Sequence, residues 1–107
     1  MSKPDIIIHQ WIKNGDVEAV LDLSNLELNM MIPIPINVKK LNISNNNITE
    51  LSALPTNLKE LDCSNNKIKK MMLPLSLEKI ICSNNDLKVY PNQGESIKDY
   101  NMRLMLA

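Results

Sequence analysis

Aromatic residues are scarce in this 107-residue chain, at 3%, and phenylalanine is absent. Any interior must therefore be built from isoleucine, leucine, valine and methionine, within the 44% of residues that are hydrophobic. The two glycines, Gly15 and Gly94, are too far apart to form a glycine-rich phosphate-binding loop. The formal net charge is zero, with 12 basic and 12 acidic residues. This balance argues against a nucleic-acid partner, because phosphates are bound by concentrated lysine and arginine.

Groups that carry chemistry are equally scarce. Two cysteines are too few for a disulfide framework and for a zinc site, so we expect a reducing, cytoplasmic compartment. The one histidine, His9, has no neighbouring nucleophile and is expected at the surface. No long hydrophobic run is present, so we expect neither a signal peptide nor a membrane span. The sequence thus predicts no catalytic residue, no metal and no cofactor.

An internal repeat decides the fold prediction. The segments VKKLNISNNNI from Val38, LKELDCSNNKI from Leu58 and LEKIICSNNDL from Leu77 align without gaps, at spacings of 20 and 19 residues. Each is apolar at its first, fourth, sixth and last positions and has asparagine at its ninth. A degenerate copy, LDLSNLEL, begins at Leu21, 20 residues before LNISNNNI. Such periodicity is typical of repeat architectures.

The pattern L-x-x-L-x-L-x-x-N-x-L over residues 17–91 resembles the leucine-rich repeat. The 20-residue length with Leu-Pro pairs is similar to the short subclass of bacterial type III secretion effectors. Repeats ending in Cys-Ser-Asn-Asn also resemble those of large-DNA-virus proteins. The resemblance implies an α/β fold: a right-handed solenoid with one short parallel sheet, an irregular, polyproline-like convex side and helical end caps.

The residues themselves support the same architecture. Leu41 and Ile43 alternate with Asn42, as expected for a short strand with one buried face. An asparagine follows each strand where the chain turns inward, and its buried amide can pair with backbone groups of neighbouring coils. These ladder asparagines are Asn46, Asn66 and Asn85, and Leu26 takes their place in the first repeat.

We therefore expect residues 1–107 to form one domain. Residues 4–15 form an N-terminal cap helix, residues 17–91 about four repeats, and residues 92–107 a C-terminal cap with a helix. The isoleucines beside Trp11 are alternatively a membrane-interface anchor, but a cap explains the same residues. Cys63 and Cys82 fall at equivalent inward positions, where small core residues are favoured over a redox disulfide or half of a zinc site.

The outward, concave face of the predicted sheet is the candidate binding surface. Ile81 is informative, because it is apolar where the other repeats are polar. The residues expected on this face are Asp22, Lys40, Asn42, Ser44, Glu60, Asp62, Ser64, Lys79, Ile81 and Ser83.

Three functions are consistent with these sequence features. The first is a non-catalytic module that binds a protein partner through the concave face. The second is a structural component of a virion or larger assembly, held by its edges and caps. The third, implied by the effector resemblance, is the substrate-recognition part of a ubiquitin ligase, although both cysteines here are expected in the core.

Overall fold

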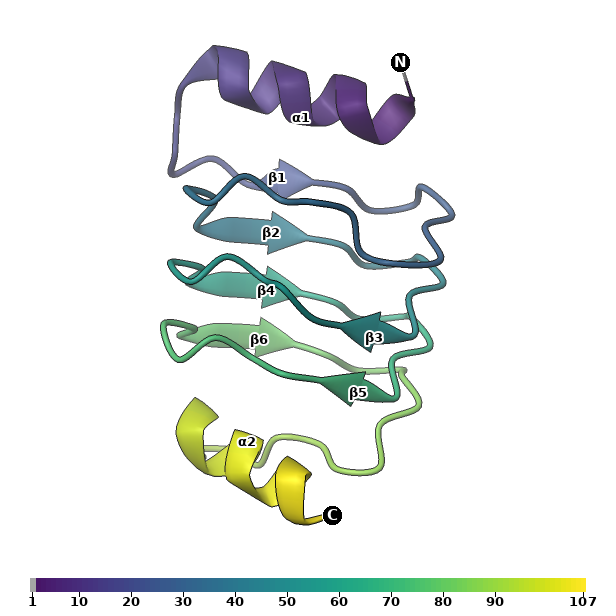
Figure 1. The fold of residues 1–107 in the computed structure, drawn as a ribbon, viewed down its shortest axis with the longest axis vertical. Helices are drawn as coiled ribbons and strands as arrows, with labels where there is room; N and C mark the ends of the chain where they lie inside the picture. The colour runs from purple at the N-terminus through teal and green to yellow at the C-terminus, as the bar shows by residue number, and fades with distance from the viewer. Residues whose placement is uncertain (1) are drawn as a thin grey trace.

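The computed structural model describes residues 2–107 as an elongated α/β structure of 40 × 25 × 19 Å. Two helices lie at opposite ends of the long axis, and short strands lie in layers between them (Figure 1). The elements in chain order are α1 (Lys3–Asn14), β1 (Leu21–Asp22), β2 (Lys40–Asn42), β3 (Glu50–Leu51), β4 (Glu60–Asp62), β5 (Lys70–Met71), β6 (Lys79–Ile81) and α2 (Ile97–Leu106).

Helix α1 has local signals at both of its ends. Ser2 is its N-cap, and the Ser2 side chain accepts a hydrogen bond from the backbone N–H of Asp5 at 3.4 Å. Gly15 ends the helix at φ +73°, in the left-handed conformation that glycine adopts without steric cost. Trp11 is buried against the strands, and its Nε1–H donates to the carbonyl of Ala19 at 3.0 Å. The helix thereby covers the β1 end of the strands.

The main sheet is parallel, with strand order β1-β2-β4-β6. Its register joins Leu21, Leu41, Leu61 and Ile80, which are equivalent positions of the repeat. Because one short strand comes from each repeat at a nearly constant spacing, neighbouring strands pair without slipping. The parallel sheet predicted from the repeat is present.

A second sheet occupies the side that was expected to be irregular. Strands β3 and β5 pair in parallel, with Glu50 opposite Lys70 and Leu51 opposite Met71. The prediction of one sheet was therefore wrong within residues 2–107. The physical reason is again the constant repeat, which brings residues 50 and 70 into register. Pro55 and Pro74 lie beyond these strands, so they do not block the pairing.

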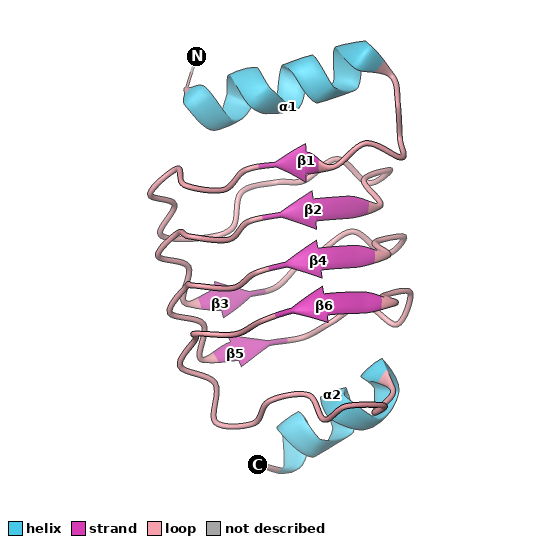
Figure 2. Cartoon of the chain, turned by 180° about the vertical axis from the view of Figure 1, so that it is seen from behind, coloured by secondary structure: helices cyan, strands magenta, loops and turns pink. Residues whose placement is uncertain are grey.

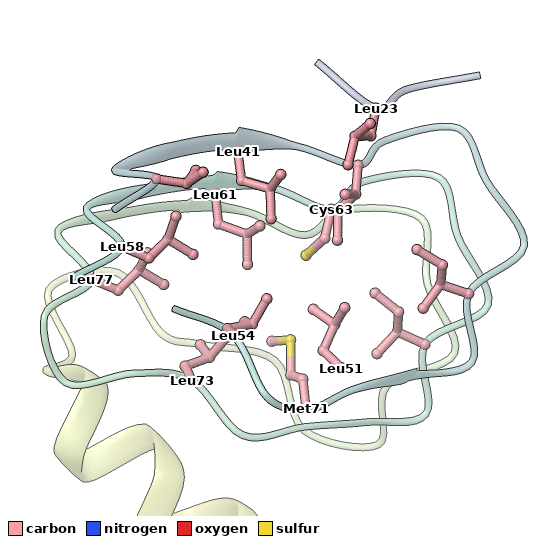
Figure 3. Packing of buried hydrophobic residues seen from close by; sticks show 14 of the residues in the cluster. Leu23, Leu41, Leu51, Leu54, Leu58, Leu61, Cys63, Met71, Leu73 and Leu77 are labelled. Carbon is pink, nitrogen blue, oxygen red and sulfur yellow. The ribbon is translucent and has the colours of Figure 1, made fainter. Parts of the chain in front are cut away.

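The hydrophobic core lies between the two sheets. Figure 3 shows Leu41, Leu61 and Cys63 pointing from the main-sheet side toward Leu51 and Met71 on the other side. These five side chains are 2% exposed or less. Aliphatic side chains thus fill an interior that has little aromatic content.

Asparagines shape the turn after each strand of the main sheet. Four of them adopt positive φ values of 54–57°, namely Asn25, Asn45, Asn65 and Asn84. Asparagine adopts this left-handed region more readily than most other residues except glycine. The repeated Asn-Asn pair thus has two separate tasks: the first residue bends the chain, and the second points its side chain inward.

The second asparagine of each pair links two coils. The Nδ2 group of Asn66 donates to the carbonyls of Ile43, Cys63 and Ser64 at 3.0–3.2 Å. Its Oδ1 atom accepts from the backbone N–H of Ile48 at 3.1 Å. Asn46 and Asn85 make corresponding bonds in their own coils. Every buried side-chain nitrogen and oxygen of residues 2–107 has a hydrogen-bond partner.

Helix α2 covers the other end of the strands. Ser96 is its N-cap, and Tyr100 is fully buried with its hydroxyl donating to the carbonyl of Val89 at 2.8 Å. The side-chain amide of Asn101 bonds to the backbone of Leu73 as a neighbouring strand would. Its oxygen accepts from Leu73 N–H, and its nitrogen donates to Leu73 C=O. By contrast, Met105 of this helix is 74% exposed.

Candidate protein-binding face

The outward side chains of the main sheet form two rows across the strands, and we call this surface the main-sheet face. Figure 2 shows the molecule with the main sheet in front of β3 and β5. The first row consists of register partners at the strand starts, Lys40, Glu60 and Lys79. The second row consists of Asp22, Asn42, Asp62 and Ile81.

The polar members of the second row also stabilise the turns that follow the strands. The Oδ1 atom of Asp62 accepts from the backbone N–H of Ser64 at 3.1 Å and from its hydroxyl at 2.7 Å. Asn42 holds Ser44 in the same way, at 3.0 and 2.7 Å. One oxygen of each side chain is therefore bonded within the turn. The other carboxylate oxygen of Asp62 and the amide nitrogen of Asn42 take no part in these turn bonds.

This arrangement corrects two of the expected face residues. Ser44 and Ser64 are only 6% and 8% exposed, so they do not lie on the binding surface. Their hydroxyls donate to the preceding Asn42 and Asp62 and are thereby drawn into the turn. The sequence contains the signal for this as a repeated Asp/Asn-x-Ser, which the alternation of polar and apolar residues does not reveal.

The last coil departs from the pattern. Ile81 replaces the aspartate or asparagine of the earlier coils and is 42% exposed. Without that acceptor, Ser83 is not drawn inward and is exposed. The second row of the main-sheet face thus changes from Asp22 at β1 to Ile81 at β6. At the β1 end of the face, Val20 is 54% exposed and lines the same depression as Ile81.

Charges on this face are arranged in alternation. Lys40 Nζ lies 4.0 Å from Glu60 Oε2, and both side chains are partly exposed. Lys79 is the register partner of Glu60 on its other side. A shallow depression of about 190 Å³ lies among these residues, with Asn42 and Asp62 in its lining. Exposed ion pairs of this kind contribute little to stability, so their side chains can change partners on binding.

The residues considered for chemistry lie apart from this face. His9 is exposed on α1. Cys63 is buried and Cys82 partly buried, and burial raises the pKa of both thiols. Residues 2–107 contain no group of three or more His, Cys, Asp or Glu side chains placed to hold a metal ion.

Neither helix is a candidate for crossing a membrane. Across residues 2–107, no helix has both the length and the apolar character that spanning a bilayer requires.

Comparison with known proteins identifies the repeats. Residues 36–74, less than half of the chain, match the family described as leucine rich repeats, with two copies. No curated protein matches the chain. The matched segment includes β2, β3, β4 and β5, so the similarity to leucine-rich repeats lies in the central part of the molecule. Such repeats are in general non-enzymatic modules for protein–protein interaction.

Proposed function

We propose that the chain is a leucine-rich-repeat solenoid that binds a protein partner through the main-sheet face, without catalytic chemistry of its own. The leucine-rich-repeat match supports the general role. The observation that carries the choice of surface is the pair of registered rows, in which alternating charges lie beside a second row that ends in exposed Ile81.

Several physical features favour this face as a contact surface. Its backbone is held by parallel pairing and by the ladder asparagines, so little conformational entropy is lost when a partner docks. An exposed apolar side chain beside polar groups provides both burial and orientation. Alternating charges reject partners whose charges do not match. We expect the partner to be met in a cytoplasmic, reducing environment.

An affinity capture from lysate of the native host tests the proposal. Wild type is compared with the face variant Lys40→Glu, Asp62→Lys and Ile81→Asp. A control variant carries Lys13→Glu, Glu27→Lys and Ile36→Asp, which make the same charge changes at exposed positions outside the main sheet. Far-UV circular dichroism first establishes that each variant folds.

We expect the face variant to lose a protein that wild type and the control variant both capture. Equal capture by all three proteins would contradict binding through the main-sheet face. Loss with the control variant alone would instead favour the assembly role, in which caps and edges make the contact. Thioester formation with ubiquitin at either cysteine would contradict a non-catalytic module.

A further inference from the structure

A groove separates strand β5 from the last turn of helix α2. Its volume is about 770 Å³, within the range of ~300–1,000 Å³ that is usual for ligand sites. In Figure 1, β5 is the strand of the two-stranded sheet that lies nearest α2. Within residues 2–107, β5 pairs with β3 alone. Beside its other edge, Asp86 N–H donates to the carbonyl of Ile68, and the Asn101 side chain bonds both backbone groups of Leu73. This groove is on a different surface from the main-sheet face.

The base and one wall of the groove are apolar. Leu51 and Met71, which are 2% and 1% exposed, form part of the lining together with Leu104. Met72 and Met105 are 52% and 74% exposed. Methionine is flexible and adapts to side chains of different shape. The groove therefore offers a place for a bulky apolar side chain.

The rim of the groove carries positive charge. Lys69, Lys70 and Lys88 are exposed and line it, and none of them forms an ion pair within residues 2–107. Glu50 and Asp86 also line the groove, so among the side chains three cations stand against two carboxylates. On the main-sheet face, by contrast, Lys40 is paired with Glu60. The unpaired lysines of the groove complement an acidic ligand.

We infer that this groove binds an extended peptide segment in which acidic side chains flank a bulky apolar one. The apolar side chain lies against the methionines and leucines, and the carboxylates meet the three lysines. An anionic bilayer fits less well, because the surface is hollow and two carboxylates lie within it.

The test uses random linear peptides displayed on phage and selected on the whole wild-type chain. Selected peptides are synthesised with a fluorescent label, and their binding is measured by fluorescence polarisation. The groove variant carries Lys70→Glu and Lys88→Glu, and the matched control carries Lys3→Glu and Lys13→Glu at the opposite end of the molecule. All four positions are exposed, and circular dichroism establishes that each variant folds.

We expect selection to enrich peptides with aspartate or glutamate beside leucine, phenylalanine or tryptophan. Their dissociation constant should rise about tenfold or more in the groove variant, a change of about 1.4 kcal/mol or more, and stay unchanged in the control. Binding should also weaken as salt concentration rises, because exposed charges are screened.

Three results would overturn the inference. The first is a selection without acidic enrichment. The second is equal binding of the peptides by wild type and the groove variant, or loss of all of them in the face variant (Lys40→Glu, Asp62→Lys and Ile81→Asp) instead. The third is binding of wild type, but not of the groove variant, to phosphatidylserine vesicles without any peptide binding, which would make the ligand a membrane.

Discussion

The tetrapeptide Cys-Ser-Asn-Asn occurs twice, as residues 63–66 and 82–85, in two different environments. In the first copy, Cys63 is fully buried, and Ser64 and Asn66 are each 8% exposed. In the second copy, the corresponding cysteine and ladder asparagine are partly exposed and the serine is exposed. The same four residues are thus buried to different extents, because a further coil follows the first copy, whereas helix α2 follows the second.

The two copies show that the burial of a side chain in a repeat protein depends on the neighbouring coil as well as on local sequence. Asn85 makes the same set of four hydrogen bonds as Asn66, but water reaches its surroundings. An additional local difference, Asp62 against Ile81, decides whether the serine two positions later turns inward. Substitutions made in pairs can separate the two influences.

The ladder asparagines give the largest expected difference. Asn66→Ala removes four hydrogen bonds and leaves buried backbone groups unpaired. We expect the free energy of unfolding to fall by about 3 kcal/mol or more, since each unpaired buried group costs about 1–3 kcal/mol. Asn85→Ala should cost about half as much, because water can replace part of its bonding. Urea denaturation measures both, and an equal or larger cost at Asn85 would contradict the account.

The two cysteines give the next difference. Cys63→Ser places a hydroxyl in an apolar interior, and we expect a loss of about 2 kcal/mol in the free energy of unfolding. Cys82→Ser should cost less than about 1 kcal/mol, because this side chain is partly exposed. Native-state labelling with an aromatic disulfide reagent provides an independent measurement. Burial raises the pKa of both thiols, so both should react slowly, with Cys63 the slower of the two.

The turn contacts give a smaller difference. Asp62→Ala removes two hydrogen bonds to Ser64, and we expect a loss of about 1 kcal/mol. Ile81→Asp provides Ser83 with the acceptor that it lacks, so it should leave stability unchanged within about 0.5 kcal/mol or raise it slightly. Thermal denaturation of both variants checks this. A large loss on Ile81→Asp would show that Ile81 stabilises the fold, which the account does not predict.

The smallest effect is a pH dependence at the C-terminal end. Arg103 lies 2.6 Å from Glu95 and holds the pKa of that carboxyl at about 2. Because the folded-state pKa is lowered, the stabilisation is fully present above the ordinary pKa of 4.5 and is lost as pH falls from there to about 2. Glu95→Gln should therefore lower stability at neutral pH and make little difference well below pH 2.

Glu27→Gln, at an exposed carboxylate without an ion pair within residues 2–107, is the control for the pH experiment. It should leave the pH dependence of unfolding unchanged. Carboxyl chemical shifts followed by NMR measure the pKa of Glu95 directly. A pKa near 4.5 would contradict the ion pair between Arg103 and Glu95.

Much of the fold was predictable because the repeat constrains it strongly. The spacing of Leu41, Leu61 and Ile80 predicted the strand register, and the cap helix expected over residues 4–15 is present as α1. The pairing of β3 with β5 was not predicted, because the linking segments vary in sequence and only their equal length brings them together. The contact of Asn101 with Leu73 depends on the placement of α2, which no local pattern specifies.

The candidate site was predictable only in part. Alternation identified which strand residues point outward, but it did not show that Asp62 and Asn42 also bind the following serines. The groove beside β5 was missed altogether, because it joins residues from β3, β5 and the end of α2. A surface built from segments far apart in the chain requires their three-dimensional arrangement.

The most direct test of the proposed function places a photo-crosslinking amino acid at position 81, on the main-sheet face. A second protein carries the same group at position 30, where Met30 is 70% exposed and lies outside the sheets. After irradiation in native lysate, we predict a discrete covalent adduct with a protein partner from position 81 and none from position 30. Adducts from position 30 alone, or the same adducts from both positions, would contradict binding through the main-sheet face.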